Sequence, residues 1–345
     1  MRREAIGNRK FICSILGAVL FTLCSPLVLV PCASAQLQRP GKIPRIGYLD
    51  NSTASGMAVL LDVFRQELSK LGWIEGKNIV IESRFAEGKN DRLPELAADL
   101  IRLKTDLIVA SGALAARAAK AATITIPIVT TATGDPVELG LVTSLARPGG
   151  NVTGLSSLTS ELNSKRLEIL KDAVPKLARV GLLRQQVGSQ LVAGDPQTKE
   201  LRPAALTLKI KLEEIETELD PKSLDHAFQI AKQKQVGAIM TTAGRPLFAE
   251  RKRIVDLAAK YRLPAIYFQK EFVDEGGLMS YGVDFDDLYR RTAVYVDKIL
   301  KGAKPADLPV QQATKFEFVI NLKAAKQIGL TIPPEVLARA NRVIK

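Results

Sequence analysis

Apolar runs of strand length alternate with amphipathic segments of helical period from residue 43 onward. Ile46–Leu49 is the first such run, and the segment after it has the 3-4-3 spacing of one helical face at Leu61, Phe64, Leu68 and Leu71. The alternation continues with predicted strands at residues 78–82, 107–110 and 126–131 and predicted helices at residues 91–103 and 113–122. This pattern is typical of a parallel β-sheet with helices on both faces.

A second series of the same kind follows a break at Pro148-Gly149-Gly150. It has predicted strands at residues 179–183, 212–215, 238–242 and 265–268 and predicted helices at residues 198–207, 224–234 and 247–261. The two series predict two Rossmann-like, three-layer α/β lobes, made of residues 36–150 with 276–307 and residues 151–275 with 308–345. Breaks near 150, 276 and 308 would let the chain pass between the lobes three times. Three connecting strands would form a hinge that permits closure around a ligand.

The N-terminal segment has the three parts of a secretory signal. Basic residues precede an apolar run at residues 11–30, and Ala33-Ser34-Ala35 supplies a small-x-small cleavage pattern. We therefore expect residues 1–35 to be removed after Ala35 and the mature chain to reside in the periplasm. A membrane anchor is one alternative, because about 20 apolar residues can span a bilayer. Lipidation of Cys32 is another, although Pro31 fits that motif poorly.

Charge and composition narrow the function classes. The chain has a formal net charge of +13, and removal of residues 1–35, with four basic residues and one acid, leaves +10. The basic residues are scattered along predicted helices with few aromatic residues among them, which favours a solvated basic surface over a nucleic-acid site.

Signatures of catalysis are sparse. All three cysteines lie in the signal segment, and His226 is the single histidine, so neither a usual zinc site nor a histidine-based metal cluster is expected. No P-loop, Gly-x-Ser-x-Gly elbow or dinucleotide-binding glycine motif is present where it would be required. We expect no cofactor and no enzymatic activity, while an exported enzyme relying on Asp and Glu alone remains an alternative.

Polar residues follow the predicted strands at their carboxyl ends, where parallel α/β sheets bind ligands. The candidate ligand-binding residues are Asn51, Ser52, Ser111, Gly112, Thr131, Thr133, Asp135, Gln185, Thr241, Thr242 and Asp284. The helix that begins after Ser111-Gly112 has exposed N–H groups that favour an anion, so a carboxylate ligand would suit it. Asp135 or Asp284 could then hold an ammonium group. The alternative for each residue is helix capping or turn formation.

Several motifs match a known family in order along nearly all of the mature chain. They include Glu75-Gly76-Lys77-Asn78-Ile79, Gly134-Asp135-Pro136-Val137, Arg147-Pro148-Gly149-Gly150-Asn151-Val152-Thr153-Gly154 and Gly276-Gly277-Leu278-Met279-Ser280-Tyr281-Gly282. The chain resembles the ABC-transporter substrate-binding proteins of the tryptophan/tyrosine-type group, which have the type I periplasmic binding protein fold. The resemblance implies a monomeric receptor that holds a small molecule, an amino acid or related organic acid, and delivers it to an ABC permease in the inner membrane.

Two loops of the second lobe depart from the family pattern. They read Arg184-Gln185-Gln186-Val187-Gly188 and Ala243-Gly244-Arg245-Pro246, where many members have Asn-Pro or Asp-Pro pairs. Arg184 or Arg245 would favour an acidic group on the ligand. A ligand-sensing module for a membrane receptor would share the fold and the cleft, so it stays an alternative to uptake.

Overall fold

The computed structural model describes residues 42–157, 162–185 and 196–345. The predicted signal segment and its cleavage site lie outside the described residues, as do residues 186–188 of the altered loop. Residues Ile43–Lys345 form one compact unit. No described helix is both long and apolar enough to cross a lipid bilayer.

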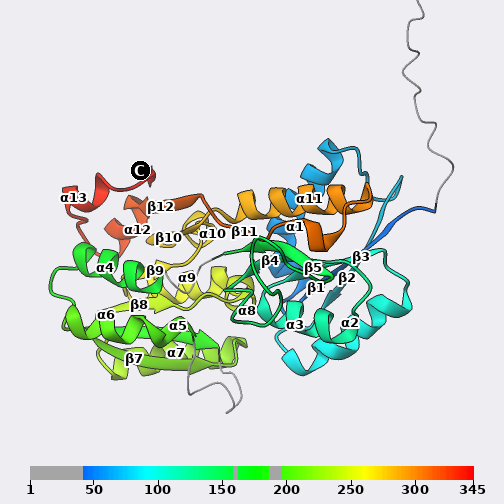
Figure 1. Cartoon of the computed structure of the whole chain (residues 1–345). Helices are drawn as coiled ribbons and strands as arrows, with labels where there is room; N and C mark the ends of the chain where they lie inside the picture. Colours follow the sequence, from blue (N-terminus) through cyan, green and yellow to red (C-terminus); the bar gives the residue numbers. More distant parts are fainter. Residues whose placement is uncertain (1–41, 158–161, 186–195) are drawn as a thin grey trace, which may run out of the picture. The chain divides into compact units, whose positions relative to one another are not determined.

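The first sheet has six parallel strands in the order β11-β5-β4-β3-β1-β2 (Figure 1). Their bounds are β1 (Arg45–Asp50), β2 (Val80–Phe85), β3 (Leu107–Ser111), β4 (Ile128–Thr133), β5 (Val152–Ser156) and β11 (Gln311–Gln312). The helices that pack with this sheet are α1 (Ala54–Lys70), α2 (Leu93–Arg102) with the 3-10 turn η1 (Asn90–Arg92) before it, α3 (Ala113–Ala122) and α11 (Phe285–Leu300). The predicted alternation of strands and helices is confirmed here.

The second sheet has seven strands in the order β13-β12-β10-β9-β8-β6-β7, all parallel except the β10–β12 pair. Its strands are β6 (Arg179–Gln185), β7 (Lys211–Thr217), β8 (Ala238–Thr241), β9 (Ala265–Tyr267), β10 (Met279–Val283), β12 (Phe316–Asn321) and β13 (Arg342–Ile344). The accompanying helices are α4 (Asn163–Ala173), α5 (Pro196–Lys199), α6 (Leu201–Thr207), α7 (Pro221–Gln233), α8 (Arg245–Ala249), α9 (Arg251–Lys260), α10 (Glu271–Asp274), α12 (Leu322–Gln327) and α13 (Pro334–Leu337), with the 3-10 turn η3 (Pro305–Asp307) after α11.

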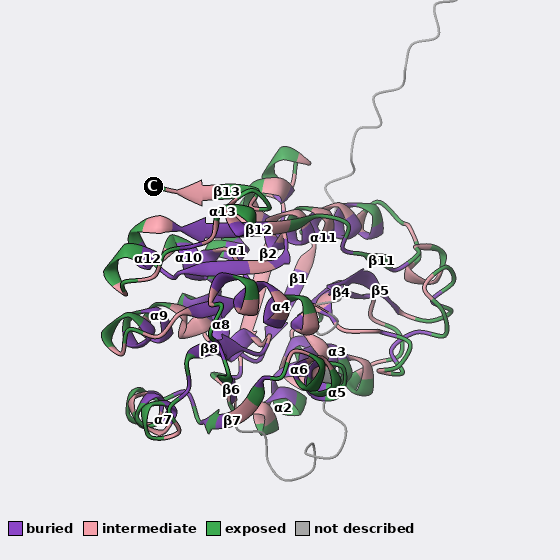
Figure 2. Cartoon of the chain, turned by 90° about the vertical axis from the view of Figure 1, so that its left-hand side faces the viewer, coloured by how far each residue is buried: buried purple, intermediate pink, exposed green. Residues whose placement is uncertain are grey.

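Helices cover both faces of the first sheet because successive side chains of a strand point to opposite faces. Tyr48 in β1 packs in the cluster that contains Phe64 of α1 and Leu288 of α11, whereas Leu49 packs with Leu96 of α2. Figure 2 shows the central strands β1, β3, β4 and β5 as the buried layer, with exposed residues on the outer surfaces of the helices. Each fully buried Leu or Phe contributes about 1.5–3 kcal/mol relative to exposure.

The chain passes between the two sheets three times, each time a few residues after the break in the sequence pattern. β5 joins the first sheet, so the first passage follows residue 156 and not residue 150. β10 joins the second sheet, so the second passage lies between β10 and α11, after residue 283. The third passage leads from β11 to β12. The division into two closing lobes stays a prediction.

The predicted breaks and the observed passages differ because the glycine motifs lie in turns and at close strand contacts, and not where the chain changes sheets. Gly154 in β5 has φ +129°, and a Cβ atom there would lie 2.2 Å from the carbonyl oxygen of Thr130 in β4. Only glycine permits this approach between two strands of one sheet. Gly276, with φ +101°, lies in the turn between α10 and β10. The second predicted strand also begins later than expected, because the side-chain amide of Asn78 holds a turn through Gly72 and Ile74.

One hydrophobic cluster extends from helices of the first sheet to helices of the second. It joins Phe64 of α1 and Phe285 of α11 to Phe248 of α8 and Phe228 of α7. Helix α8 packs on both α1 and β6, and a Cβ atom on Gly56 would lie only 2.3 Å from the Cβ atom of Ala249. Helices of the two sheets therefore contact each other closely where α1 packs on α8.

Candidate ligand-binding site

A fully buried carboxylate lies where β1 ends. Asp50 accepts a hydrogen bond from the Ser52 backbone N–H through Oδ1 (2.8 Å) and from the Tyr48 hydroxyl through Oδ2 (3.2 Å). Burial raises the pKa of Asp50, while the nearby Arg245 charge and these hydrogen bonds oppose the shift. The carboxylate is thus held in one orientation at the carboxyl end of the first sheet.

Two tyrosines extend this polar cluster to the next strand. The hydroxyl oxygens of Tyr48 and Tyr289 are 3.2 Å apart, and that of Tyr289 is 3.0 Å from Ser111 Oγ. All three side chains are buried. Burial raises the pKa of both tyrosines, so they remain neutral hydroxyl groups at physiological pH. Asp50 and Ser111 are also register partners on β1 and β3, so the cluster joins the ends of two adjacent strands.

Arg245 approaches the cluster from the second sheet, at the first position of α8. Only 7% of the residue is exposed, and its guanidinium carbon lies 4.7 Å from the centre of the Phe285 ring. Its backbone carbonyl accepts a hydrogen bond from Ser52 Oγ (3.1 Å). Nη1 is buried without a hydrogen-bond partner, and within the described residues the side chain makes no hydrogen bond or ion pair. A buried guanidinium nitrogen without an acceptor is costly unless a ligand supplies one.

The N-terminus of α3 lies beside Arg245. Gly112 has φ +84°, donates its N–H to the Thr131 carbonyl (2.8 Å) and provides no side-chain cap for the helix. A Cβ atom on Gly112 would be 3.7 Å from Arg245 Cγ, so the absence of a side chain leaves the helix end next to the arginine. The first N–H groups of a helix lack intrahelical partners and attract an anion.

Two predicted threonines lie near the carboxyl ends of strands in the two sheets, Thr131 two residues before the end of β4 and Thr241 at the end of β8. Thr131 in β4 and Thr241 in β8 are fully buried, and the hydroxyl oxygen of each has no hydrogen-bond partner among the described residues. Thr242, beside Thr241, donates its backbone N–H to Leu183 (3.0 Å). The structure therefore brings Ser52, Ser111 and Gly112 together with Arg245 and places Thr131 on the next strand.

The other predicted site residues have protein partners of their own. Thr133 Oγ1 donates to the Leu155 carbonyl (3.4 Å), Asn51 donates to Asn90 Oδ1 (3.2 Å), and Gln185 contacts the Gly88 carbonyl (3.5 Å) from the second sheet. Asp135 is a turn residue that accepts from the Val137 N–H (2.7 Å), and Asp284 is the N-cap of α11 and accepts from the Asp287 N–H (3.0 Å). The alternative of turn formation or helix capping describes both carboxylates, and their contact with a ligand stays a prediction.

The prediction of site residues omitted Asp50, Tyr48 and Tyr289. Asp50 immediately precedes Asn51 in the same strand-end segment, so its position was a usable signal. No local pattern could identify Tyr289, which meets Tyr48 across 241 positions of sequence. The two candidate arginines also differ in their ion pairs, because Arg184 is paired with Glu214 (2.9 Å) and Glu216 (3.8 Å), whereas Arg245 has no such partner among the described residues.

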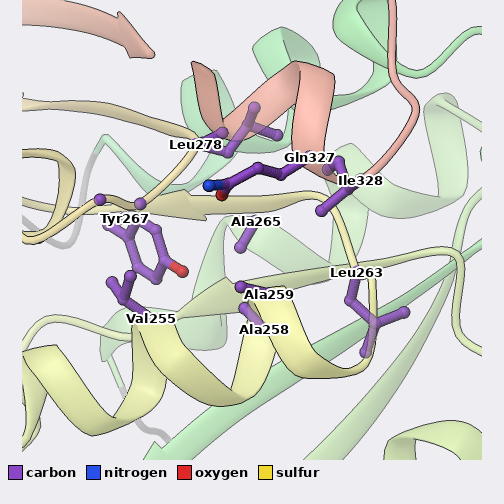
Figure 3. A pocket seen from close by; sticks show the side chains of 12 residues that line it. Val255, Ala258, Ala259, Leu263, Ala265, Tyr267, Leu278, Gln327 and Ile328 are labelled. Carbon is purple, nitrogen blue, oxygen red and sulfur yellow. The ribbon is translucent and has the colours of Figure 1, made fainter. Parts of the chain in front are cut away.

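A small cavity of about 20 Å³ lies elsewhere in the second sheet, among α9, β9 and α12 (Figure 3). Val255, Ala258, Leu263 and Ile328 line it, together with the ring of Tyr267. A space of this size holds about one water molecule. It is therefore too small for an amino acid or a related organic acid.

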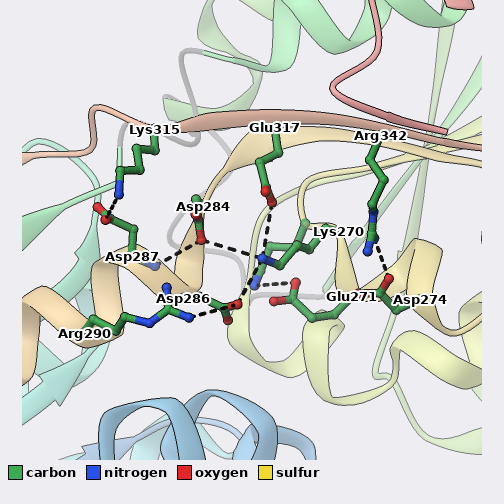
Figure 4. A network of polar contacts seen from close by, with 11 residues as sticks. Lys270, Glu271, Asp274, Asp284, Asp286, Asp287, Arg290, Lys315, Glu317 and Arg342 are labelled. Carbon is green, nitrogen blue, oxygen red and sulfur yellow. Dashed lines mark hydrogen bonds and ion pairs between the residues drawn. The ribbon is translucent and has the colours of Figure 1, made fainter. Parts of the chain in front are cut away.

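A second charged cluster surrounds Lys270, beside the passages between the sheets (Figure 4). The ammonium group lies 3.0 Å from Asp286, 3.3 Å from Glu317 and 3.7 Å from Asp284. These carboxylates raise the pKa of Lys270 against the opposing effect of burial. In the described part of the chain, no group of three or more His, Cys, Asp or Glu residues is arranged to hold a metal ion.

A family model described as ABC transporter substrate binding protein matches residues 54–344 of the chain. The chain therefore belongs to the family of ABC transporter substrate-binding proteins, as its motifs indicated. A tyrosine-binding protein of Clostridioides difficile is 28% identical over 269 residues, which are 77% of this chain and 75% of that protein.

Solved structures agree with this assignment. A conserved domain protein of Vibrio cholerae matches with a TM-score of 0.76 at 28% identity, over 88% of this chain and 100% of that chain. The complex of an ABC domain with L-Trp from Streptococcus pneumoniae matches with a TM-score of 0.74 at 26% identity, over 87% and 100%. The ligand-free, open structure of an adhesive substrate-binding protein from Clostridium difficile matches with a TM-score of 0.59 at 25% identity, over 88% and 99%. The predicted type I periplasmic binding protein fold is confirmed.

Proposed function

We propose that this substrate-binding protein captures an amino acid between its two sheets, in the periplasm, and delivers it as a monomer to an ABC permease. Thr131 Oγ1, Thr241 Oγ1 and Arg245 Nη1 carry the ligand proposal, because they are buried polar atoms without partners. Thr131 lies two residues before the end of β4, Thr241 ends β8, and Arg245 begins the helix after β8, so all three are near the carboxyl ends of strands, where parallel α/β sheets bind their ligands. Buried polar groups normally have partners, so these atoms mark places where a ligand supplies them.

The relatives support an amino-acid ligand. One is named for tyrosine binding, and another was solved with L-Trp. The chain also matches the L-Trp complex with a higher TM-score than the open, ligand-free structure, 0.74 against 0.59, at nearly equal identity. This agrees with the close contact of α1 and α8, which brings the two sheets together as ligand closure would.

Binding without catalysis is the role that the side chains support. His226 is exposed on α7, so the polar cluster around Asp50 contains no imidazole base. The tyrosines and serines of the cluster are hydrogen-bonded to one another and hold Asp50 in place. Such fixed polar groups suit the recognition of a solute.

Native mass spectrometry of the purified protein, followed by calorimetry with the amino acids, tests the proposal. We expect a bound amino acid or a saturable affinity, together with a Tm that rises with ligand concentration, because ligand binds the folded state. Thr131→Val and Thr241→Val should each weaken binding by about 1 kcal/mol, the usual net value of a hydrogen bond. Exposed Thr207→Val in α6 is the matched control. The absence of any amino-acid binding by the folded parent would contradict the proposed ligand.

A further inference from the structure

We propose that the site recognises both charges of an α-amino acid, with the ligand carboxylate bound between Arg245 and the N-terminus of α3 and the ligand ammonium bound at Asp50. The inference rests on the proposed function and adds which residues recognise each charge. It also explains why two oppositely charged side chains from different sheets are buried near each other.

The carboxylate half rests on two independent groups of unsatisfied donors. Arg245 is more than nine-tenths buried, its Nη1 has no acceptor, and stacking on Phe285 fixes the guanidinium plane. The N-terminus of α3 lacks a side-chain cap, and Gly112 leaves it next to the Arg245 side chain. A planar guanidinium binds a carboxylate through two parallel hydrogen bonds, and helix N–H groups can satisfy the remaining lone pairs.

The ammonium half rests on Asp50. Its carboxylate is fully buried, and the positive charge of Arg245 lowers its pKa against the effect of burial. In the described part of the chain, the two side chains form no ion pair within 4 Å. Each oxygen accepts one hydrogen bond, from Ser52 and from Tyr48, which fixes the carboxylate and leaves acceptor capacity for a cation. A positive ligand group placed there would complete its neutralisation.

The spacing of the two halves suits one small zwitterion. Asp50 and Ser111 are register partners on adjacent parallel strands, and α3 begins two residues after Ser111. Adjacent strands lie about 4.8 Å apart. An α-amino acid has its ammonium and its carboxylate on the same carbon, so a single ligand at these strand ends can meet both charges.

Calorimetry with three probes separates the two charges. The probes are L-tyrosine, tyramine, which lacks the carboxylate, and 3-(4-hydroxyphenyl)propionate, which lacks the ammonium; L-tryptophan, tryptamine and indole-3-propionate form a second set. We expect the parent to bind the amino acid at least about 100-fold more tightly than either analogue. Arg245→Gln should weaken amino-acid binding at least about 30-fold but change the affinity for the amine analogue by less than about 3-fold. Asp50→Asn should also weaken amino-acid binding at least about 30-fold but change the affinity for the acid analogue by less than about 3-fold.

Arg184→Gln is the matched control, because that buried arginine is paired with Glu214 and Glu216, and the preference of the parent should persist. Arg245→Lys is a second variant in case Arg245→Gln does not fold. It retains the positive charge but loses the planar guanidinium, so we expect a loss of amino-acid affinity smaller than that of Arg245→Gln. If Arg245→Gln or Arg245→Lys folds and keeps the full preference for amino acid over amine, the charge assignment is overturned while the proposed function stands. A folded parent that binds neither amino acid contradicts the proposed ligand for these probe sets.

Discussion

Two cations of the second sheet, the half-buried Lys270 and the buried Arg245, have opposite surroundings. Lys270 is surrounded by Asp284, Asp286 and Glu317 within 3.7 Å. Arg245 is more deeply buried, yet its side chain has no ion pair or hydrogen bond within the described residues. The lysine therefore completes a structural cluster where the chain passes between the sheets. The arginine remains available for an acceptor that the protein does not provide.

Replacing each cation with methionine gives the largest test of this comparison. Lys270→Met should lower the free energy of unfolding by about 2–4 kcal/mol, because the neighbouring carboxylates would lose their shared partner. Arg245→Met should lower it by less, about 1 kcal/mol, because Asp50 loses a nearby positive charge but keeps its two hydrogen bonds, and no ion pair within 4 Å among the described residues is broken. Urea unfolding at pH 7 measures both.

The two methionine variants should affect ligand affinity in the reverse order of their effects on stability. Arg245→Met should abolish most amino-acid binding, whereas Lys270→Met should leave the affinity of the folded protein within about 3-fold, because the lysine lies outside the proposed contacts. Equal destabilisation by the two substitutions would contradict the comparison and make Arg245 a structural residue.

The contact between the sheets can be tested at Gly56. Gly56→Ala would place a Cβ atom 2.3 Å from the Cβ atom of Ala249, so α1 and α8 would have to separate. We expect about 10-fold weaker ligand binding and a destabilisation of about 1–3 kcal/mol from overpacking. Small-angle scattering should report a larger radius of gyration.

Two further variants control this substitution. Ala249→Gly combined with Gly56→Ala removes the nearest obstructing atom and should restore part of the affinity. Gly150→Ala should be neutral, because a Cβ atom there meets nothing within 4 Å. Unchanged affinity and dimensions in Gly56→Ala would show that the α1–α8 contact does not limit closure.

The smallest expected effect concerns Glu271, the buried carboxyl group next to Lys270. Glu271 lies next to Lys270 in the chain but is outside its ion pairs, and burial raises the pKa of Glu271 to about 7. Because this pKa exceeds the unfolded value of 4.5, the folded state retains a proton that the unfolded state loses. Stability from this group is present below pH 4.5 and is lost as the pH rises through about 7.

Glu271→Gln should remove this pH dependence. We expect the variant to gain about 1–2 kcal/mol over the parent at pH 8 and to match it near pH 4.5, measured by urea unfolding. Gln269, which donates to Glu271 Oε2 at 3.3 Å, can donate equally to the new amide oxygen. A parallel pH profile for parent and variant would be evidence against the raised pKa.

Much of the fold could be predicted because its signals are local. Short apolar runs and helical spacing identified most strands and helices, and the family motifs identified the class of protein. The glycine breaks at 150 and 276 misled the prediction of the passages, because a glycine that ends a turn and a glycine in a connection look alike in sequence. Sheet membership of β5 and β10 depends on partners far along the chain.

The candidate site divides in the same way. The sequence by itself determined that Ser52, Ser111 and Thr131 lie near the carboxyl ends of strands, because strand ends and turn residues are encoded within a few positions. Only the tertiary structure decided that Arg184 is paired and Arg245 is not, since burial and hydrogen-bond partners come from segments distant in sequence. The physical reason is that an unpaired charge is costly only where water is excluded, and the packing of both sheets excludes water from Arg245.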